Sequence, residues 1–220
     1  MTRLRLILAS LTFSLTACAA HAAQPTTLHS QADAPSGILS PKAEIDRAAV
    51  RAKLAGRREQ TIKNFLEYRN AMVYPMNELP GGGFRHVWMD RAGHLCAAAT
   101  LISKDWGRDA TIRVGANDVE LKIADVKSGP VLEWLLTSGM TRAEVVAIQV
   151  PGFQYEESTR DREVNRLYAI YFDVERQIHS LDAINLDLAT DELMKHPALA
   201  RQLLDGHLAG PGKFAKPPVG

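Results

Sequence analysis

The side chains that could do chemistry are concentrated in one stretch of the chain, residues 79–102, which reads LPGGGFRHVWMDRAGHLCAAATLI. It holds two imidazoles, one carboxylate and one thiol, those of His86, His94, Asp90 and Cys96. Groups of these three kinds are good ligands for a borderline metal such as zinc, so His86 and His94 are candidate metal ligands. The same four residues are the candidate catalytic residues of the chain.

The spacing of the four residues matches none of the short motifs that place metal ligands on one helical turn or one knuckle. A site therefore depends on how the chain folds around them. The alternation of side chains over 84–89 predicts a short strand, and Asp90 and Gly93 suit the first and last positions of a type I turn. In that arrangement His86 and His94 could face each other across the turn. A simpler interpretation gives Asp90 a role in the turn and places His94 in a loop.

Cys96 has two interpretations. A helix N-terminus with a histidine nearby lowers the pKa of a thiol, which would make Cys96 a nucleophile. Three alanines and then Leu101 and Ile102 follow it, however, and this apolar run predicts a buried helix and an inert thiol. The other cysteine, Cys18, lies in the leader, so Cys96 has no intramolecular disulfide partner.

Other catalytic and binding chemistries lack their sequence signatures. The Pro-Gly-Gly-Gly run at 80–83 is not followed by the Lys-Ser or Lys-Thr pair of a phosphate-binding loop, so its glycines predict a tight or mobile loop instead. There is no Gly-x-Ser-x-Gly motif of a serine hydrolase. A formal net charge of +1 gives no indication of a nucleic-acid partner. No cofactor is predicted, and the partner is an unknown protein or small molecule.

Residues 1–22 have the organisation of an export signal. Arg3 and Arg5 form a basic start, an apolar run over 6–15 follows, and small residues come next. The apolar run is far shorter than the roughly 20 residues of a membrane span, so no transmembrane helix is predicted.

Two processing sites are compatible with this signal. Ala20-His21-Ala22 would release a soluble chain that begins at Ala23. Leu15-Thr16-Ala17-Cys18 resembles a lipobox, in which Cys18 would carry a lipid and become the first residue. The expected location is the periplasm or the outer membrane, with the membrane reached only through a lipid at Cys18.

The elements around the reactive stretch begin with a flexible linker over 23–40 and a helix over 41–72. Ser40 suits the N-cap of this helix and Pro41 its first position, while Gly56 indicates a kink or a division into two helices. One face of the helix is basic, and we expect it to be exposed to solvent: Arg47, Arg51, Arg57, Arg58 and Lys63.

A core module is expected over 57–152. Residues 108–126 fit either a hairpin or a helix ending near Asn117 followed by one strand. A helix from Pro130 to Gly139 and a second one up to Gln149 form an αα-hairpin, with Thr141 and Glu144 as the capping box of the second.

C-terminal helices are expected over 158–208, comprising a strongly amphipathic helix over 163–181, a shorter one from Asp191 and a last one over 199–208. A disordered tail is expected over 209–220. The chain is therefore predicted to have a mainly helical α+β fold, in which one compact domain contains a short strand or hairpin and long helices flank it.

Residues 57–151 resemble an uncharacterised family of exported bacterial proteins. The resemblance lies in Tyr74-Pro75-Met76-Asn77, in Trp88-Met89-Asp90 with Gly93, in Cys96-Ala97-Ala98 and in the hairpin from Trp134 to Gln149. It implies no activity, but it implies that 109–117 is helical.

The function we expect from these observations is that of an exported, non-catalytic envelope protein acting as a binding or structural module. A metal-dependent or thiol-using hydrolase with a site around His86, Asp90, His94 and Cys96 is the first alternative. An inhibitor or immunity-like partner of another exported protein is the second.

Overall fold

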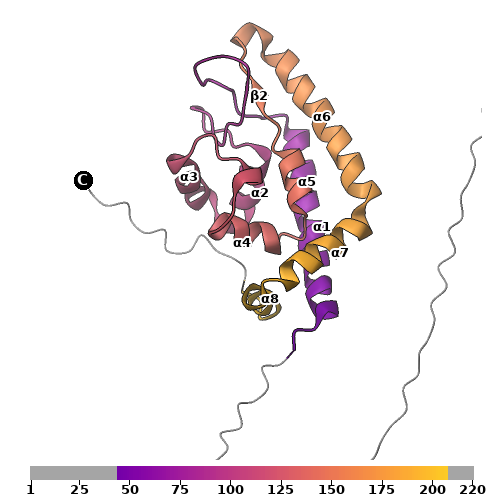
Figure 1. Cartoon of the computed structure of the whole chain (residues 1–220). Coiled ribbons are helices and arrows are strands. Elements are labelled where there is room, and N and C mark those ends of the chain that lie inside the picture. The colour runs from indigo at the N-terminus through magenta and orange to yellow at the C-terminus, as the bar shows by residue number, and fades with distance from the viewer. Residues whose placement is uncertain (1–43, 208–220) are drawn as a thin grey trace, which may run out of the picture. The chain divides into compact units, whose positions relative to one another are not determined.

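The computed structural model describes residues 44–207, which Figure 1 shows as a coloured ribbon. The predictions made for the export signal at 1–22, for Cys18, for the linker at 23–40 and for the tail at 209–220 lie outside the described residues.

The described residues form eight α-helices, two 3₁₀-helices and one two-stranded sheet. The strands β1 (Phe84–Arg85) and β2 (Gly152–Phe153) pair antiparallel. This architecture confirms the predicted mainly helical α+β fold. The helices are α1 (Arg47–Ala71), α2 (Ala97–Trp106), α3 (Arg108–Asn117), α4 (Pro130–Thr137), α5 (Arg142–Ile148), α6 (Arg160–Ser180), α7 (Asp182–Met194) and α8 (Pro197–Leu204).

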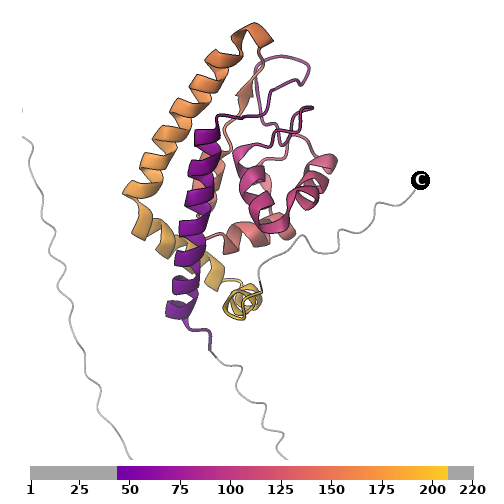
Figure 2. The ribbon, with the colours of Figure 1, turned by 180° about the vertical axis from the view of Figure 1, so that it is seen from behind.

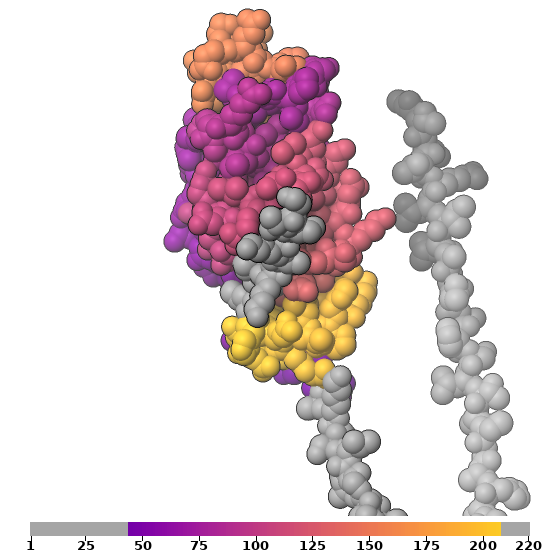
Figure 3. Space-filling model, turned by 90° about the vertical axis from the view of Figure 1, so that its left-hand side faces the viewer, coloured from indigo at the N-terminus to yellow at the C-terminus, as the bar shows by residue number. Residues whose placement is uncertain are grey.

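The long helix α1 is the element on which the others pack. It contacts α2, α6, α7 and α8, and Figure 2 shows α6 on one side of it and α2 and α3 on the other. A large apolar cluster around Phe65, Trp88 and Tyr171 joins α1 to α2 and α6. A smaller cluster around Leu54 and Leu193 joins α1 to α7 and α8, which lie at one end of the molecule (Figure 3, yellow).

The beginning of α1 differs from the prediction. Asp46 is the N-cap, because its carboxylate accepts a hydrogen bond from the amide of Ala48 at 2.8 Å, and residues 44–46 are not helical. The predicted start of the helix at residue 41 is therefore wrong. Aspartate is as favourable an N-cap as serine, and Asp46 takes that role further along the chain than Ser40. The helix also continues through Gly56 without a break.

The basic face of α1 is exposed only in part: Arg47 and Lys63 are exposed, as predicted, but Arg58 is buried, and four of the five cations pair with acids from distant parts of the chain. Arg58 is only 2% exposed and donates to both carboxylate oxygens of Glu144, at 2.9 and 2.7 Å, and to Asp182 at 2.7 Å. Three further pairs join α1 to α7 and α2: Arg47 with Asp191, Arg51 with Asp187, and Arg57 with Asp105.

The reactive stretch forms a shorter strand than predicted, followed by the predicted turn and helix. Only Phe84 and Arg85 pair with a second strand, whereas Met89 forms an isolated bridge with Leu95. The amide of Gly93 donates to the carbonyl of Asp90 at 3.0 Å, which closes the predicted turn. The buried helix α2 follows.

Residues 108–126 comprise α3, a loop and a short 3₁₀-helix (Ile123–Asp125). The predicted hairpin is therefore wrong, whereas the alternative is correct in its helix ending at Asn117 and wrong in the strand after it. The helix α3 agrees with the implied helix at 109–117. It is held by Trp88, whose indole N–H donates to the carbonyl of Thr111 at 3.0 Å. The loop after it is held by Gln149, whose side chain accepts from the amide of Ile123 and donates to the carbonyl of Leu121.

The αα-hairpin of α4 and α5 is confirmed, including its capping box. The hydroxyl of Thr141 accepts from the amide of Glu144, and the Glu144 carboxylate accepts from the amide of Thr141 at 2.8 Å. The turn between the helices lies directly on α1, where the hydroxyl of Thr61 donates to the carbonyl of Ser138 at 3.0 Å.

The C-terminal helices differ from the prediction mainly at α7, which begins at Asp182 rather than at Asp191. Its early part was missed because apolar residues lie on two sides of it: Leu186 is buried, while Ile184 and Leu188 are exposed. Such a pattern lacks the single apolar stripe that marks an amphipathic helix. Within residues 44–207, no helix has the length and apolar content needed to cross a membrane.

Candidate functional site

The turn in the reactive stretch brings Asp90 and His94 into direct contact. The Asp90 carboxylate accepts from the His94 amide at 2.7 Å and from the Met76 amide at 2.9 Å, and it lies 2.9 Å from Nδ1 of the His94 ring. The Asp90 side chain is 1% exposed and that of His94 is 29% exposed. A buried carboxylate thus fixes the ring of a histidine that reaches solvent.

This contact determines what the His94 ring can offer to a ligand. A carboxylate only accepts hydrogen bonds, so it places the ring hydrogen on Nδ1 and leaves Nε2 as a free acceptor in the neutral ring. The same arrangement is found where a histidine binds a metal or acts as a general base, because it fixes the ring orientation and raises its basicity. A structural role in closing the turn uses only the Nδ1 side.

The His94 ring lines an open cleft of about 490 Å³ between α1 and the 92–95 turn with α2. Its apolar lining includes Tyr68, Leu95 and Val73. Its polar and charged lining comes from six further residues: Asn64, Glu67, Thr100, Ser103, Lys104 and Arg108. A volume of this size is within the range of small-molecule sites.

Two cations stand at the α2 and α3 side of the cleft. Lys104 pairs with Glu67 at 3.2 Å, but both side chains are about half exposed, and such pairs are weak. Arg108 is exposed and donates one of its N–H groups to the carbonyl of Gly93. Lys104 and the remaining N–H groups of Arg108 can therefore turn to a ligand.

Cys96 is buried, which agrees with its interpretation as a small core residue. It is 4% exposed at the N-cap position of α2, and it does not line the cleft. Burial raises the pKa of the Cys96 thiol to about 11, although backbone amides at the start of α2 and the Gln149 side chain act in the opposite direction. A nucleophilic thiol needs the reverse conditions, exposure and a low pKa.

The Cys96 thiol is accordingly expected to be inert in the native protein. In a Cys18→Ser background, where Cys96 is the single thiol, a colorimetric disulfide reagent at mild alkaline pH should react only after denaturation. Val119→Cys, which introduces a thiol at a position 51% exposed, is the control and should react at once. Stoichiometric reaction of native Cys96 within minutes would contradict the burial.

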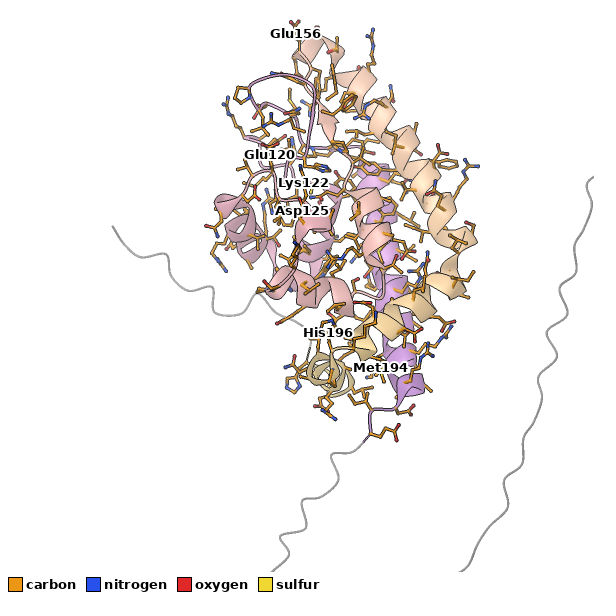
Figure 4. All side chains as sticks on the ribbon, in the orientation of Figure 1. Glu120, Lys122, Asp125, Glu156, Met194 and His196 are labelled. Atoms are coloured by element: carbon orange, nitrogen blue, oxygen red, sulfur yellow. The ribbon has the colours of Figure 1, made fainter. Side chains whose placement is uncertain are left out.

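His86 does not line the cleft and does not face His94 across the turn, so that expectation is wrong. The bridge between Met89 and Leu95 places Asp90 opposite His94, so His86 is further from the turn. Burial lowers the pKa of His86, and the charge of Lys122 lowers it further. Its Nδ1 is buried without a hydrogen-bond partner among the described residues. The loop beside it carries Glu120, Lys122 and Asp125 (Figure 4).

Of the four predicted site residues, the structure joins Asp90 with His94 and leaves His86 and Cys96 outside the cleft. Within residues 44–207, no three His, Cys, Asp or Glu side chains are grouped closely enough to hold a metal ion. Lys104 and Arg108 were missed by the sequence analysis. Their helices are visible in the sequence, but the packing of α2 and α3 beside the turn is not.

Comparison of the chain with protein-family models, with curated proteins and with solved structures finds no match. The resemblance of 57–151 to exported bacterial proteins stays a prediction.

The two members of the Asp90–His94 pair are expected to differ in their effect on stability. Asp90→Ala leaves the partly buried amides of Met76 and His94 without their acceptor, which should lower the free energy of unfolding by about 2–3 kcal/mol. His94→Ala removes one partly exposed contact and should cost about 1 kcal/mol or less. Urea denaturation measures both. If both variants lost the same free energy of unfolding, His94 would contribute as much to stability as Asp90. That result would contradict a His94 ring that is available to a ligand.

Proposed function

We propose that this protein is an exported, non-catalytic binding module that holds a small anionic ligand in the cleft beside His94. The observation that carries the proposal is the buried Asp90 carboxylate, which fixes the ring of His94, a 29% exposed side chain that lines a cleft of about 490 Å³. The proposal that the protein is exported rests on residues 1–22. Export would bring the protein to the periplasm or, through a lipid at Cys18, to the outer membrane.

The charges around the cleft support an anion. Lys104 and Arg108 contribute two positive charges, and Glu67 contributes one negative charge that is already engaged by Lys104. A carboxylate or phosphate can take the place of Glu67 at Lys104 and accept from the open N–H groups of Arg108. A hydroxyl or N–H group of the same ligand can donate to Nε2 of His94, which the Asp90 contact leaves as an acceptor in the neutral ring.

The apolar part of the cleft lining adds a second requirement on the ligand. The side chains of Tyr68, Leu95 and Val73 can contact the carbon atoms of a bound molecule. A small molecule with one anionic group and a short apolar body fits both parts of the cleft. The thiol-hydrolase alternative lacks comparable support, because Cys96 is buried with a raised pKa.

Calorimetric titration with acetate, succinate and inorganic phosphate at low ionic strength tests the proposal. We expect saturable binding of at least one of these probes, weakened at least about tenfold by Lys104→Glu or Arg108→Glu. Lys127→Glu is the matched control, since Lys127 is exposed and does not line the cleft. The proposal fails if none of the probes binds, or if Lys127→Glu weakens binding as much as Lys104→Glu does.

A further inference from the structure

The His94 ring offers a hydrogen-bond acceptor to a molecule in the cleft that it lines. Its Nδ1 lies 2.9 Å from the Asp90 carboxylate, which can only accept, so the hydrogen of the neutral ring stays on Nδ1. Nε2 is directed away from Asp90, because the two nitrogens of an imidazole point away from each other. Within residues 44–207, the buried side-chain nitrogen and oxygen atoms without a partner belong to Tyr68 and His86. The unpaired Nε2 of His94 is therefore accessible.

Arg108 is held against the turn that carries this ring. One of its N–H groups donates to the carbonyl of Gly93, the residue that precedes His94. The contact is close, because a Cβ added to Gly93 would lie 2.9 Å from a guanidinium nitrogen of Arg108. The remaining N–H groups of the guanidinium can bind an anion. A carboxylate held by them lies beside the turn, and the carbon next to that carboxylate is close to the His94 ring.

We propose that the ligand of this cleft is a carboxylate whose neighbouring carbon carries a hydroxyl or an amide N–H, an identity that rests on the proposed binding of an anion there. α-Hydroxy acids and N-acylated amino acids have this chemistry. The carboxylate binds Arg108 and Lys104, and the hydroxyl or N–H on the next carbon donates to Nε2 of His94. The remaining substituent of that carbon contacts the apolar lining, which includes Tyr68 and Leu95.

The acceptor at His94 also determines which similar molecules bind less well. A carboxylate without a hydroxyl or N–H on the neighbouring carbon leaves Nε2 to water and gains nothing from it. An ether oxygen in the same place brings only lone pairs, so it faces Nε2 with one acceptor against another. The cleft should therefore prefer a hydroxyl to an ether of nearly the same shape, because only the hydroxyl donates.

Calorimetric titration of the full chain at about pH 8, where imidazole rings are neutral, tests this preference. The probes are α-hydroxyisocaproate, its methoxy ether and isocaproate, which share one carbon skeleton. We expect the hydroxy acid to bind about three- to tenfold more tightly than isocaproate, and the methoxy ether to bind no more tightly than isocaproate. N-acetylleucine provides the amide N–H on the same skeleton, and the tighter of the two donors identifies the source of the N–H or hydroxyl.

His94→Phe keeps an aromatic ring at this position and removes the acceptor. It should abolish the preference for α-hydroxyisocaproate while leaving the affinity for isocaproate unchanged. His196→Phe is the matched control, because His196 is exposed and does not line the cleft, and it should keep the preference. Circular dichroism of both variants checks that the fold is retained.

The outcomes separate this proposal from the proposed function. Equal affinities for the hydroxy acid, its ether and isocaproate would overturn the donor requirement and leave an anion-binding cleft. Binding of acetate, succinate or phosphate without binding of α-hydroxyisocaproate or N-acetylleucine would do the same. A preference for the hydroxy acid that survives His94→Phe also overturns it, since another group would then accept the hydrogen bond. If none of the anions binds, both proposals fail.

Discussion

Arg58→Ala is expected to lower the free energy of unfolding by about 3–5 kcal/mol, the cost of removing one partner of a buried ion pair. Arg58 joins three elements, because it donates to Glu144 on α5, to Asp182 on α7 and to the carbonyl of Gly139 in the hairpin turn. Without it, the Glu144 carboxylate remains 7% exposed and keeps only its cap and its bond from Asn185. Urea denaturation measures the loss.

Arg51→Ala is the matched control for this prediction. Arg51 lies on the same helix and pairs with Asp187 on the same partner helix, but its side chain is 37% exposed. Exposed pairs contribute about 0.2–1 kcal/mol, so the control should be several times milder. Similar losses in the two variants would show that burial of the Arg58 pair is not what makes it important.

The same pair predicts how stability depends on pH. Burial alone would raise the pKa of Glu144, but hydrogen bonds from Arg58 and from the Thr141 amide hold that pKa below its usual value. A lowered folded-state pKa means that this contribution is fully present above the unfolded-state value and is lost as the pH falls through the folded-state value. Stability below about pH 4.5 should therefore fall less steeply in Arg58→Ala than in the wild type.

Gly139→Ala is expected to cost about 3 kcal/mol or more, because two penalties act at one position. The residue has a φ of +78°, which strains any side chain. A Cβ there would also lie 2.4 Å from the carbonyl oxygen of Leu54 and 2.6 Å from the amide of Arg58. Both atoms belong to the backbone of α1, so the hairpin would have to move off that helix.

Gly206→Ala separates the two penalties. Gly206 has nearly the same φ, +79°, but a Cβ there would meet no atom within 4 Å. Only the backbone strain remains, about 1–2 kcal/mol. Thermal or urea denaturation of both variants measures the difference. An equal effect at the two positions would contradict the close contact between the hairpin and α1.

The parts of the fold that the sequence predicted correctly depend on local signals. Thr141 and Glu144 form a capping box within one helical turn, and Asp90 and Gly93 close their turn through one hydrogen bond. The alanines after Cys96 predicted the buried helix α2. Each of these interactions joins residues no more than a few positions apart, so the printed residues are enough to identify it.

The parts that were wrong depend on contacts between distant residues. The spacing of the arginines on α1 is typical of a helix face exposed to solvent. No residue close to them in the sequence indicates that Arg57 and Arg58 will pair with Asp105, Glu144 and Asp182. The alternation over 84–89 predicted a strand, but only Phe84 and Arg85 pair with another strand, β2, while Met89 forms an isolated bridge with Leu95. Tertiary packing decided both outcomes.

The sequence identified only part of the candidate site. Asp90 and His94 were both singled out, and their spacing across a turn permits the contact that the structure has. The sequence could not show which of the four reactive side chains share a cleft, nor that Lys104 and Arg108 stand beside His94. Those facts depend on how α1, α2 and α3 pack.

Nitrogen-15 NMR of the histidine rings during titration with succinate tests most directly whether His94 faces a ligand. His179, which is 55% exposed on α6, provides the internal control. We expect a saturable shift of the His94 Nε2 signal and none at His179. A His94 signal that stays constant, or that moves only as much as the His179 signal, would contradict that expectation.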